Sequence, residues 1–314
     1  MVSPHHFEFE DAPMPSGPRP GEVLIKMEYF SVCGSDLRTY DRTLSEEQYP
    51  LAPGAPCHEN VGIIQESTVD HLKPGQRVIA LQAGGLVEYA SIPAVRAIPV
   101  PDQGDPAKWV LCQPVGTVMY AVQQMGSVLG KRVAIMGQGP IGLAFTDFIA
   151  RAGARDVIVS DRNDYRLDMS KKLGATHTVN ATRENIVEAV AEITQGKGVD
   201  FAVEACGRPE TLHQTFAVIR QKGTVILFGL AHDEDVFPFN FTAMHDKLPR
   251  IIATNSARGG DMPVAVEETV ALVQQGRLNL DHLLTHRFPW TQVNDAFDIY
   301  SLKKDNSFKV VMNA

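Results

Sequence analysis

The chain has 314 residues, of which 44% are hydrophobic and 21% are charged, and it carries a formal net charge of -8 at pH 7. These values are typical of a packed protein of one or two domains, and they exclude disordered, coiled-coil and collagen-like chains. Because the negative charge gives no attraction for phosphate backbones or anionic lipid, we expect no nucleic-acid partner and no membrane partner. No export signal opens the sequence, so we expect a cytoplasmic protein.

Residues 1–115 are predicted to form a mainly β domain with long loops. Short alternating strands are expected at 22–29 and 77–80, and Pro-Gly pairs mark turns beside them. The segment 255–314 is expected to return to this domain, with a helix at 263–275 and a closing strand at 308–312.

Residues 116–254 show a different pattern, in which short runs rich in Val and Ile alternate with stretches of helical periodicity. Such alternation predicts a parallel sheet with crossover helices, because strands buried on both faces are nearly continuous in apolar residues. The sequence therefore predicts an α/β domain with a doubly wound parallel sheet. Its six strands are expected at 132–136, 156–160, 177–180, 201–204, 224–228 and 251–254.

A glycine-rich segment, Gly-Gln-Gly-Pro-Ile-Gly at 137–142, follows the first of these strands and opens a helix that runs to about Ala152. Only in this strand-turn-helix context does the pattern predict a dinucleotide site. The glycines permit a tight turn and close approach of a pyrophosphate, and the free N–H groups of the helix start bind the anion. The candidate cofactor residues here are Gly137, Gly139, Pro140, Ile141 and Gly142.

Asp161 ends the next predicted strand, at the position where an acid is expected to hydrogen-bond the ribose hydroxyls of NAD. Arg162 follows it and would suit the extra phosphate of NADP, whereas Asp161 would repel that phosphate. We therefore expect NAD, with NADP as the alternative. Arg166, one helical turn further, is a candidate for the adenosine ribose or an ordinary solvated arginine.

The β domain contains Cys-Gly-Ser-Asp at 33–36 and Cys-His-Glu at 57–59. In a long chain without an export signal, cysteines are expected to bind metal or to be buried rather than to form disulfides. With the glycine fingerprint, the segment Thr-His-Arg-Phe-Pro at 285–289 and the closing strand, these motifs occur in the order seen in the medium-chain dehydrogenase/reductase family, which the chain resembles. Its zinc-dependent polyol and sugar dehydrogenases are the most similar. The resemblance implies a GroES-like catalytic domain beside the Rossmann domain.

By this resemblance Cys33, His58 and Glu59 match the ligands of one catalytic zinc ion per chain. Three protein ligands leave one position open for the substrate oxygen, as catalysis requires. Gln113 stands where the family often has glutamate, and it is expected either to bind zinc through its amide oxygen, to hold a water, or simply to start a helix. Either nearby thiol, Cys57 or Cys112, is better explained as a buried packing residue.

The resemblance also assigns Ser35 to relay of the substrate proton. Arg38 replaces the histidine that many relatives use next, and an arginine cannot release a proton at working pH. Lys309 matches a basic residue that reaches the cofactor pyrophosphate, and a surface lysine is the alternative.

The chain lacks the four-cysteine lobe of a structural zinc, and most of the family's usual first strand is missing. We expect a homo-oligomer, a dimer or a tetramer. The predicted function is zinc-dependent hydride transfer between a small secondary alcohol, such as a polyol or sugar, and NAD, with the ketone as the other partner. The alternatives are a metal-free reductase of quinones or enones and a nucleotide-binding protein without turnover.

Overall fold

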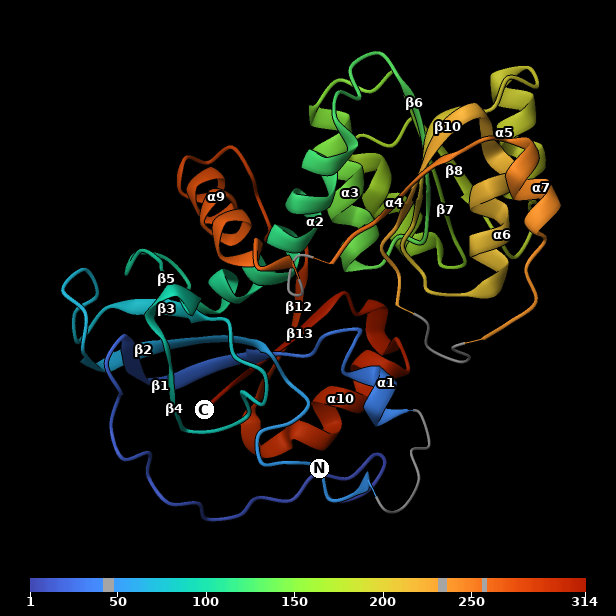
Figure 1. Cartoon of the computed structure of the whole chain (residues 1–314). Helices are drawn as coiled ribbons and strands as arrows, with labels where there is room; N and C mark the ends of the chain where they lie inside the picture. The colour runs from blue at the N-terminus through green and yellow to red at the C-terminus, as the bar shows by residue number, and fades with distance from the viewer. Residues whose placement is uncertain (42–47, 231–235, 256–258) are drawn as a thin grey trace. The chain divides into compact units, whose positions relative to one another are not determined.

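The structure is a computed structural model that describes residues 1–41, 48–230, 236–255 and 259–314. The chain divides into two compact units (Figure 1). Unit 1 contains Met1–Gly116 and Asp261–Ala314, and unit 2 contains Thr117–Gly260. The predicted divisions at 115/116 and 254/255 lie near these boundaries.

Unit 1 is built around a seven-stranded sheet with the order β12-β13-β1-β2-β3-β5, in which β4 also pairs with β1. All its pairs are antiparallel except β12 with β13. The strands are β1 (Glu22–Ser31), β2 (Glu59–Ser67), β3 (Arg77–Ala80), β4 (Tyr89–Pro93), β5 (Ala97–Pro99), β12 (Leu284–Pro289) and β13 (Lys309–Asn313). The helices are α1 (Leu37–Tyr40), α9 (Met262–Gln274) and α10 (Val293–Ser301), with the 3-10 helices η2 (Ala94–Arg96), η3 (Pro106–Leu111), η4 (Trp290–Gln292) and η5 (Lys304–Asn306).

The strand register of unit 1 gathers three distant segments at one end of the sheet. Ser31, the last residue of β1, pairs with Glu59, the first residue of β2. It also pairs with Val311 of β13 on its other side. Cys33, two residues beyond β1, and Lys309, at the start of β13, are therefore brought close to the start of β2.

Unit 2 contains a six-stranded, wholly parallel sheet with the order β11-β10-β9-β6-β7-β8. Read from β8, this is the 3-2-1-4-5-6 order of the Rossmann fold, so the predicted doubly wound sheet is confirmed. Helices α3 and α4 pack against each other, as do α5 and α6 (Figure 1). The strands are β6 (Arg132–Met136), β7 (Asp156–Asp161), β8 (His177–Asn180), β9 (Val199–Glu204), β10 (Ile219–Leu227) and β11 (Arg250–Ala253). The helices are α3 (Pro140–Arg151), α4 (Asp164–Lys172), α5 (Ile186–Thr194), α6 (Pro209–Val218) and α7 (Phe241–Asp246), and α2 (Cys112–Met125) runs across the unit boundary.

Each unit has its own hydrophobic core. The core of unit 1 includes the fully buried Phe30, Tyr40 and Phe297, and that of unit 2 includes Ile158, Val199 and Val225. Among the described residues, no helix is both long enough and apolar enough to cross a bilayer.

Candidate active site

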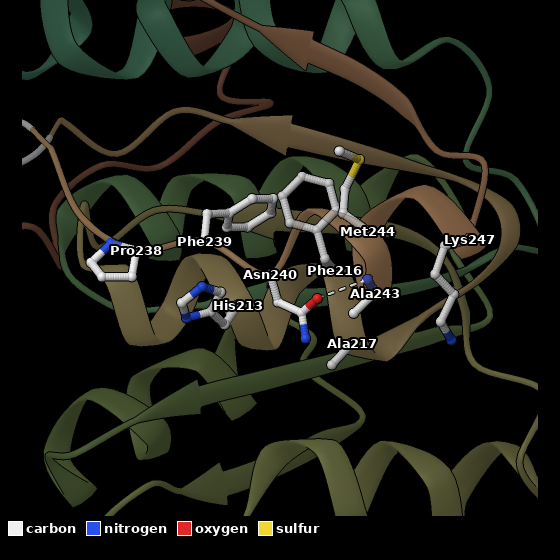
Figure 2. Close-up of a pocket in the computed structure, with 9 residues that line it drawn as sticks. All are labelled: His213, Phe216, Ala217, Pro238, Phe239, Asn240, Ala243, Met244 and Lys247. Carbon is white, nitrogen blue, oxygen red and sulfur yellow. Dashed lines mark hydrogen bonds between the residues drawn. The ribbon is translucent and has the colours of Figure 1, made fainter.

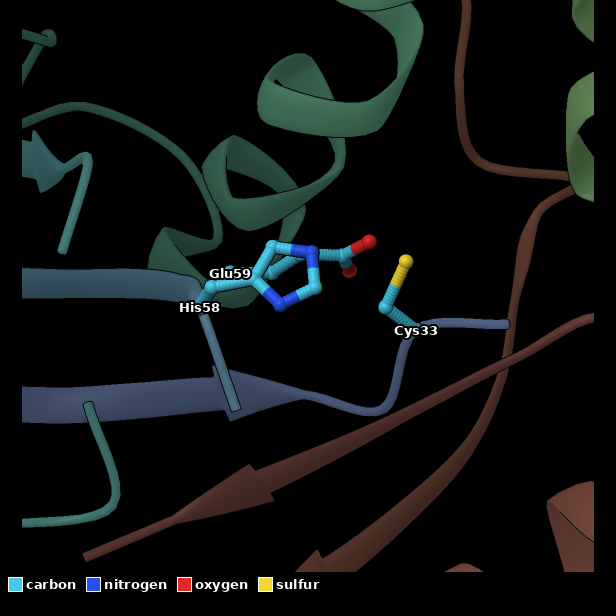
Figure 3. A group of neighbouring side chains, drawn as sticks. All are labelled: Cys33, His58 and Glu59. Carbon is cyan, nitrogen blue, oxygen red and sulfur yellow. The ribbon is translucent and has the colours of Figure 1, made fainter. Parts of the chain in front are cut away.

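Cys33, His58 and Glu59 form a group whose potential ligand atoms all lie within 4.8 Å of one another. Figure 3 shows the three side chains pointing toward a common space. Glu59 is buried, whereas Cys33 and His58 are half-buried. In a tetrahedral zinc site, neighbouring ligand atoms are roughly 3.3–3.8 Å apart, so small side-chain adjustments would bring this group onto one ion. A thiol, an imidazole and a carboxylate are ligands that zinc accepts, and the group therefore fits this metal.

Asp36 orients the imidazole of this group. Its carboxylate lies 3.1 Å from Nδ1 of His58 and also accepts a hydrogen bond from the backbone N–H of Cys33 at 2.9 Å. A proton held on Nδ1 leaves the lone pair of Nε2 for a metal. Burial lowers the pKa of His58, but Cys33 and Asp36 outweigh it and raise this pKa to about 12. The prediction did not include Asp36, although an acid three residues after a candidate thiol ligand was a usable signal.

Lys309 corrects one prediction from the sequence. It is only 2% exposed, and its ammonium donates to both carboxylate oxygens of Glu59, at 2.6 and 2.7 Å, and to the carbonyl of Val32 at 3.1 Å. Burial opposes the charge of Lys309, but Glu59 raises its pKa above the ordinary lysine value. Its burial shows that the alternative of a surface lysine is wrong, whereas the contact with a cofactor pyrophosphate remains a prediction.

Ser35 lies beside this group, with its hydroxyl 3.4 Å from Nε2 of His58. Gln113 is buried at the start of α2, where its amide nitrogen lies 3.4 Å from the sulfur of Met262. The relay role of Ser35 and the ligand role of Gln113 remain predictions. Cys57 and Cys112 are both fully buried.

The glycine fingerprint of unit 2 forms a tight turn between β6 and α3. Gly137 has a φ of 93°, which a residue with a side chain rarely adopts. A Cβ on Gly142 would lie 1.9 Å from the carbonyl oxygen of Gly137, so no side chain fits there. Pro140 occupies the first turn of α3, where it leaves no hydrogen bond unmade. The buried Gln138, not predicted as a site residue, accepts a hydrogen bond from Thr146 of α3 at 2.8 Å and fastens the turn.

Asp161, at the end of β7, is hydrogen-bonded to this turn. Its carboxylate accepts hydrogen bonds from the backbone N–H groups of Gln138 and Asn163, at 2.8 and 2.9 Å. Arg166 lies 3.8 Å from the same carboxylate with its side chain 12% exposed, whereas Arg162 is 61% exposed and faces Glu210 at 3.5 Å. The structure thus brings the fingerprint, Asp161 and Arg166 together and leaves Arg162 at the surface.

A pocket of about 800 Å³ lies on unit 2, where α6 and α7 approach each other (Figure 2). Its wall is largely apolar, with Phe216, Phe239 and Met244 among the lining residues. The side chain of Asn240 caps α7 through the N–H of Ala243. None of the predicted site residues lines this pocket, and we assign no function to it.

A Rossmann sheet with a glycine fingerprint and a β unit with a thiol, an imidazole and a carboxylate together are typical of nicotinamide-dependent dehydrogenases. Two family models match the chain: the alcohol dehydrogenase GroES-like domain at residues 19–102 and the zinc-binding dehydrogenase at residues 140–271. Together they span more than half of the chain. The chain belongs to the medium-chain dehydrogenase/reductase family, and the predicted family, fold class and enzyme class are confirmed.

Individual relatives match over nearly the whole chain. An L-threonine 3-dehydrogenase of Bacillus velezensis is 27% identical, with 96% of this chain and 94% of the relative covered. An alcohol dehydrogenase of Cupriavidus necator is 26% identical, with coverages of 99% and 97%. Among solved structures, a protein described as a zinc-binding dehydrogenase of Sinorhizobium meliloti, bound to NADP, superimposes with a TM-score of 0.82 at 25% identity, over 100% of this chain and 97% of the other.

Proposed function

We propose that the protein is a zinc-dependent dehydrogenase that oxidises a small secondary alcohol, of the polyol or sugar type, with NAD as the hydride acceptor. The observation that carries this proposal is the group formed by Cys33, His58 and Glu59, with Asp36 behind the imidazole. A metal-free reductase of quinones or enones has no need of such a group.

Bound zinc would supply a Lewis acid that lowers the pKa of the substrate hydroxyl, and bound nicotinamide would supply the hydride acceptor. The chain's own residues would bind the metal and move the substrate proton. Cys33, His58 and Glu59 would hold the metal, and Asp36 would keep the Nδ1 proton of His58 in place. Ser35 has a hydroxyl that both accepts and donates, so it can take the substrate proton and pass it to water.

The cofactor preference follows from Asp161. Its carboxylate lies beside the fingerprint turn, where it suits the two ribose hydroxyls of NAD and repels the 2′-phosphate of NADP. The exposed Arg162, paired with Glu210, offers little compensation for that repulsion.

The substrate class is supported by the names of the relatives. L-threonine 3-dehydrogenases, an alcohol dehydrogenase and, among structural neighbours, a galactitol-1-phosphate dehydrogenase and a 2R,3R-butanediol dehydrogenase are all similar to this chain. Family resemblance also supports a homo-oligomer, dimer or tetramer, and a cytoplasmic location. Analytical ultracentrifugation and cell fractionation would measure these two properties.

The test combines metal analysis of the purified protein with a spectrophotometric screen of polyols, sugars, L-threonine and ketones, using both cofactors. We expect one zinc ion per chain, and we expect Cys33→Ser to lose both zinc and turnover while the matched control Cys112→Ala keeps both. Activity on quinones or enones that survives chelation, without bound zinc, would instead identify the metal-free reductase. Binding of zinc and dinucleotide without turnover of any alcohol or ketone would identify the nucleotide-binding protein.

A further inference from the structure

Glu204 ends β9, next to β6 in the sheet and on the opposite side of β6 from β7 and Asp161. In this strand order, β6 and β9 flank the point where the direction of winding reverses, and a dinucleotide lies across it at the carboxyl ends of the strands. Because the acid of β7 marks the adenosine side, the end of β9 belongs to the nicotinamide side.

The side chain of Glu204 is 3% exposed and accepts several hydrogen bonds from the loop that follows it. One carboxylate oxygen accepts the N–H groups of Cys206 and Gly207, at 2.9 and 3.0 Å, and the hydroxyl of Thr211 at 2.7 Å. The other accepts the Gly207 N–H as well, at 3.0 Å. These partners are neutral donors. A buried carboxylate is expensive to desolvate, but as an acceptor-only group it can gather several donors at once.

The loop held by Glu204 touches the fingerprint directly. A Cβ on Gly137 would lie 2.5 Å from the sulfur of Cys206, so this sulfur fills the space beside the first glycine of the turn. A Cβ on Gly229 would lie 2.3 Å from the carboxylate of Glu204, so the chain after β10 also packs closely against this carboxylate.

We propose that Glu204 is a positioning residue for the nicotinamide half of the dinucleotide, because it holds the loop at Cys206 and Gly207 against the fingerprint turn. This inference rests on the proposed function. Glu204 does not touch the reacting atoms, and it acts through the backbone that it fixes. Glutamine in its place keeps the size but puts an amide N–H₂ where one oxygen accepted a donor, so the loop must shift.

The test uses the zinc-loaded protein and two ligands, NADH and AMP, with dissociation constants measured by nicotinamide fluorescence and by calorimetry. AMP carries only the adenosine half, which Asp161 serves. In Glu204→Gln we expect NADH binding to weaken about tenfold, the size expected for one misdirected hydrogen bond to a charged group, and AMP binding to change less than twofold. Thr211→Val, which removes one donor and is a milder change, should weaken NADH binding in the same direction by a few fold.

Two controls separate positioning from loss of stability. Thr194→Val removes a buried hydroxyl at the end of α5 in the same unit, and Glu188→Gln makes the same chemical change on an exposed part of α5. Both should bind NADH and AMP like the wild type. The proposal for Glu204 would be overturned if NADH and AMP binding weakened equally in Glu204→Gln and Thr211→Val. It would also be overturned if neither variant weakened NADH binding. Failure of the wild type to bind NADH would refute the proposed function itself.

Discussion

Replacing Lys309 with methionine would test the most tightly buried charge pair of unit 1. Lys309 is 2% and Glu59 is 0% exposed, and two hydrogen bonds of 2.6 and 2.7 Å join them. Methionine has a similar length and no charge, so Lys309→Met leaves a buried carboxylate without its cation. Breaking a buried pair in this way costs about 3–5 kcal/mol. We therefore expect the metal-free variant to lose that much free energy of unfolding.

The assay is denaturant unfolding followed by tryptophan fluorescence. The chain has two tryptophans, Trp109 and Trp290, and both lie in unit 1, so the signal reports on the unit that contains the pair. The double variant Lys309→Met with Glu59→Gln removes both charges and should recover most of the loss, since absence of a whole pair is tolerated far better than absence of one partner.

Zinc provides a second measurement on the same variant. A metal cation beside Glu59 would replace the charge lost with Lys309, so zinc should stabilise Lys309→Met more than the wild type. A loss below about 1 kcal/mol in the metal-free variant, or a double variant as unstable as the single one, would refute the reasoning that the two side chains depend on each other.

Three further predictions concern specificity, pH and metal binding. Asp161→Ser should reduce the preference for NAD over NADP by at least tenfold in kcat/KM, because it removes the repulsion of the 2′-phosphate; an unchanged ratio would contradict the assignment. The hydrogen bond from Arg287 lowers the pKa of Asp105. A carboxyl pKa that is lowered in the folded state stabilises the fold above the unfolded value, and this effect is lost as the pH falls through the folded value. Asp105→Asn should therefore cost less than about 1 kcal/mol at pH 7 and progressively less as the pH falls below the ordinary aspartate pKa, as measured by a series of urea titrations. Zinc binding at pH 8 should release at least one proton, since the raised pKa of His58 favours the protonated imidazole in the metal-free site, and calorimetry in buffers of different ionisation enthalpy should show it.

The sheet of unit 2 could be predicted because its strands are buried on both faces and therefore appear as short apolar runs. Strand β10 shows where this reasoning fails. It was expected at 224–228 but begins at Ile219, and the register with β9 shifts between Ile219 and Thr224. Between them, Arg220, Gln221 and Lys222 are exposed and polar, and Lys222 has a φ of 56°, so the pattern of apolar residues gave no sign of the longer strand.

The three side chains that the structure groups together, Cys33, His58 and Glu59, could be singled out from their motifs, but the residues that contact them could not. The pairing of Lys309 with Glu59 depends on β1 lying between β2 and β13, an arrangement that joins residues 250 positions apart. A lysine at the start of an otherwise apolar strand was the available signal, since a buried ammonium requires an acid. Glu204 was a similar signal at the end of β9, and in both cases only the fold identifies the hydrogen-bond partners.

The charges around the candidate metal site indicate how Lys309 and a bound zinc ion would complement each other. Glu59 and Asp36 are buried carboxylates, and a zinc-bound Cys33 adds a third negative charge. Zinc and Lys309 together supply three positive charges, which balance them. Without Lys309 the metal would face an excess of negative charge and would polarise a substrate oxygen less strongly. Without zinc, the excess is relieved by a proton on His58, in agreement with its raised pKa. The same buried lysine would therefore stabilise the fold when the metal is absent and strengthen the Lewis acid when zinc is bound.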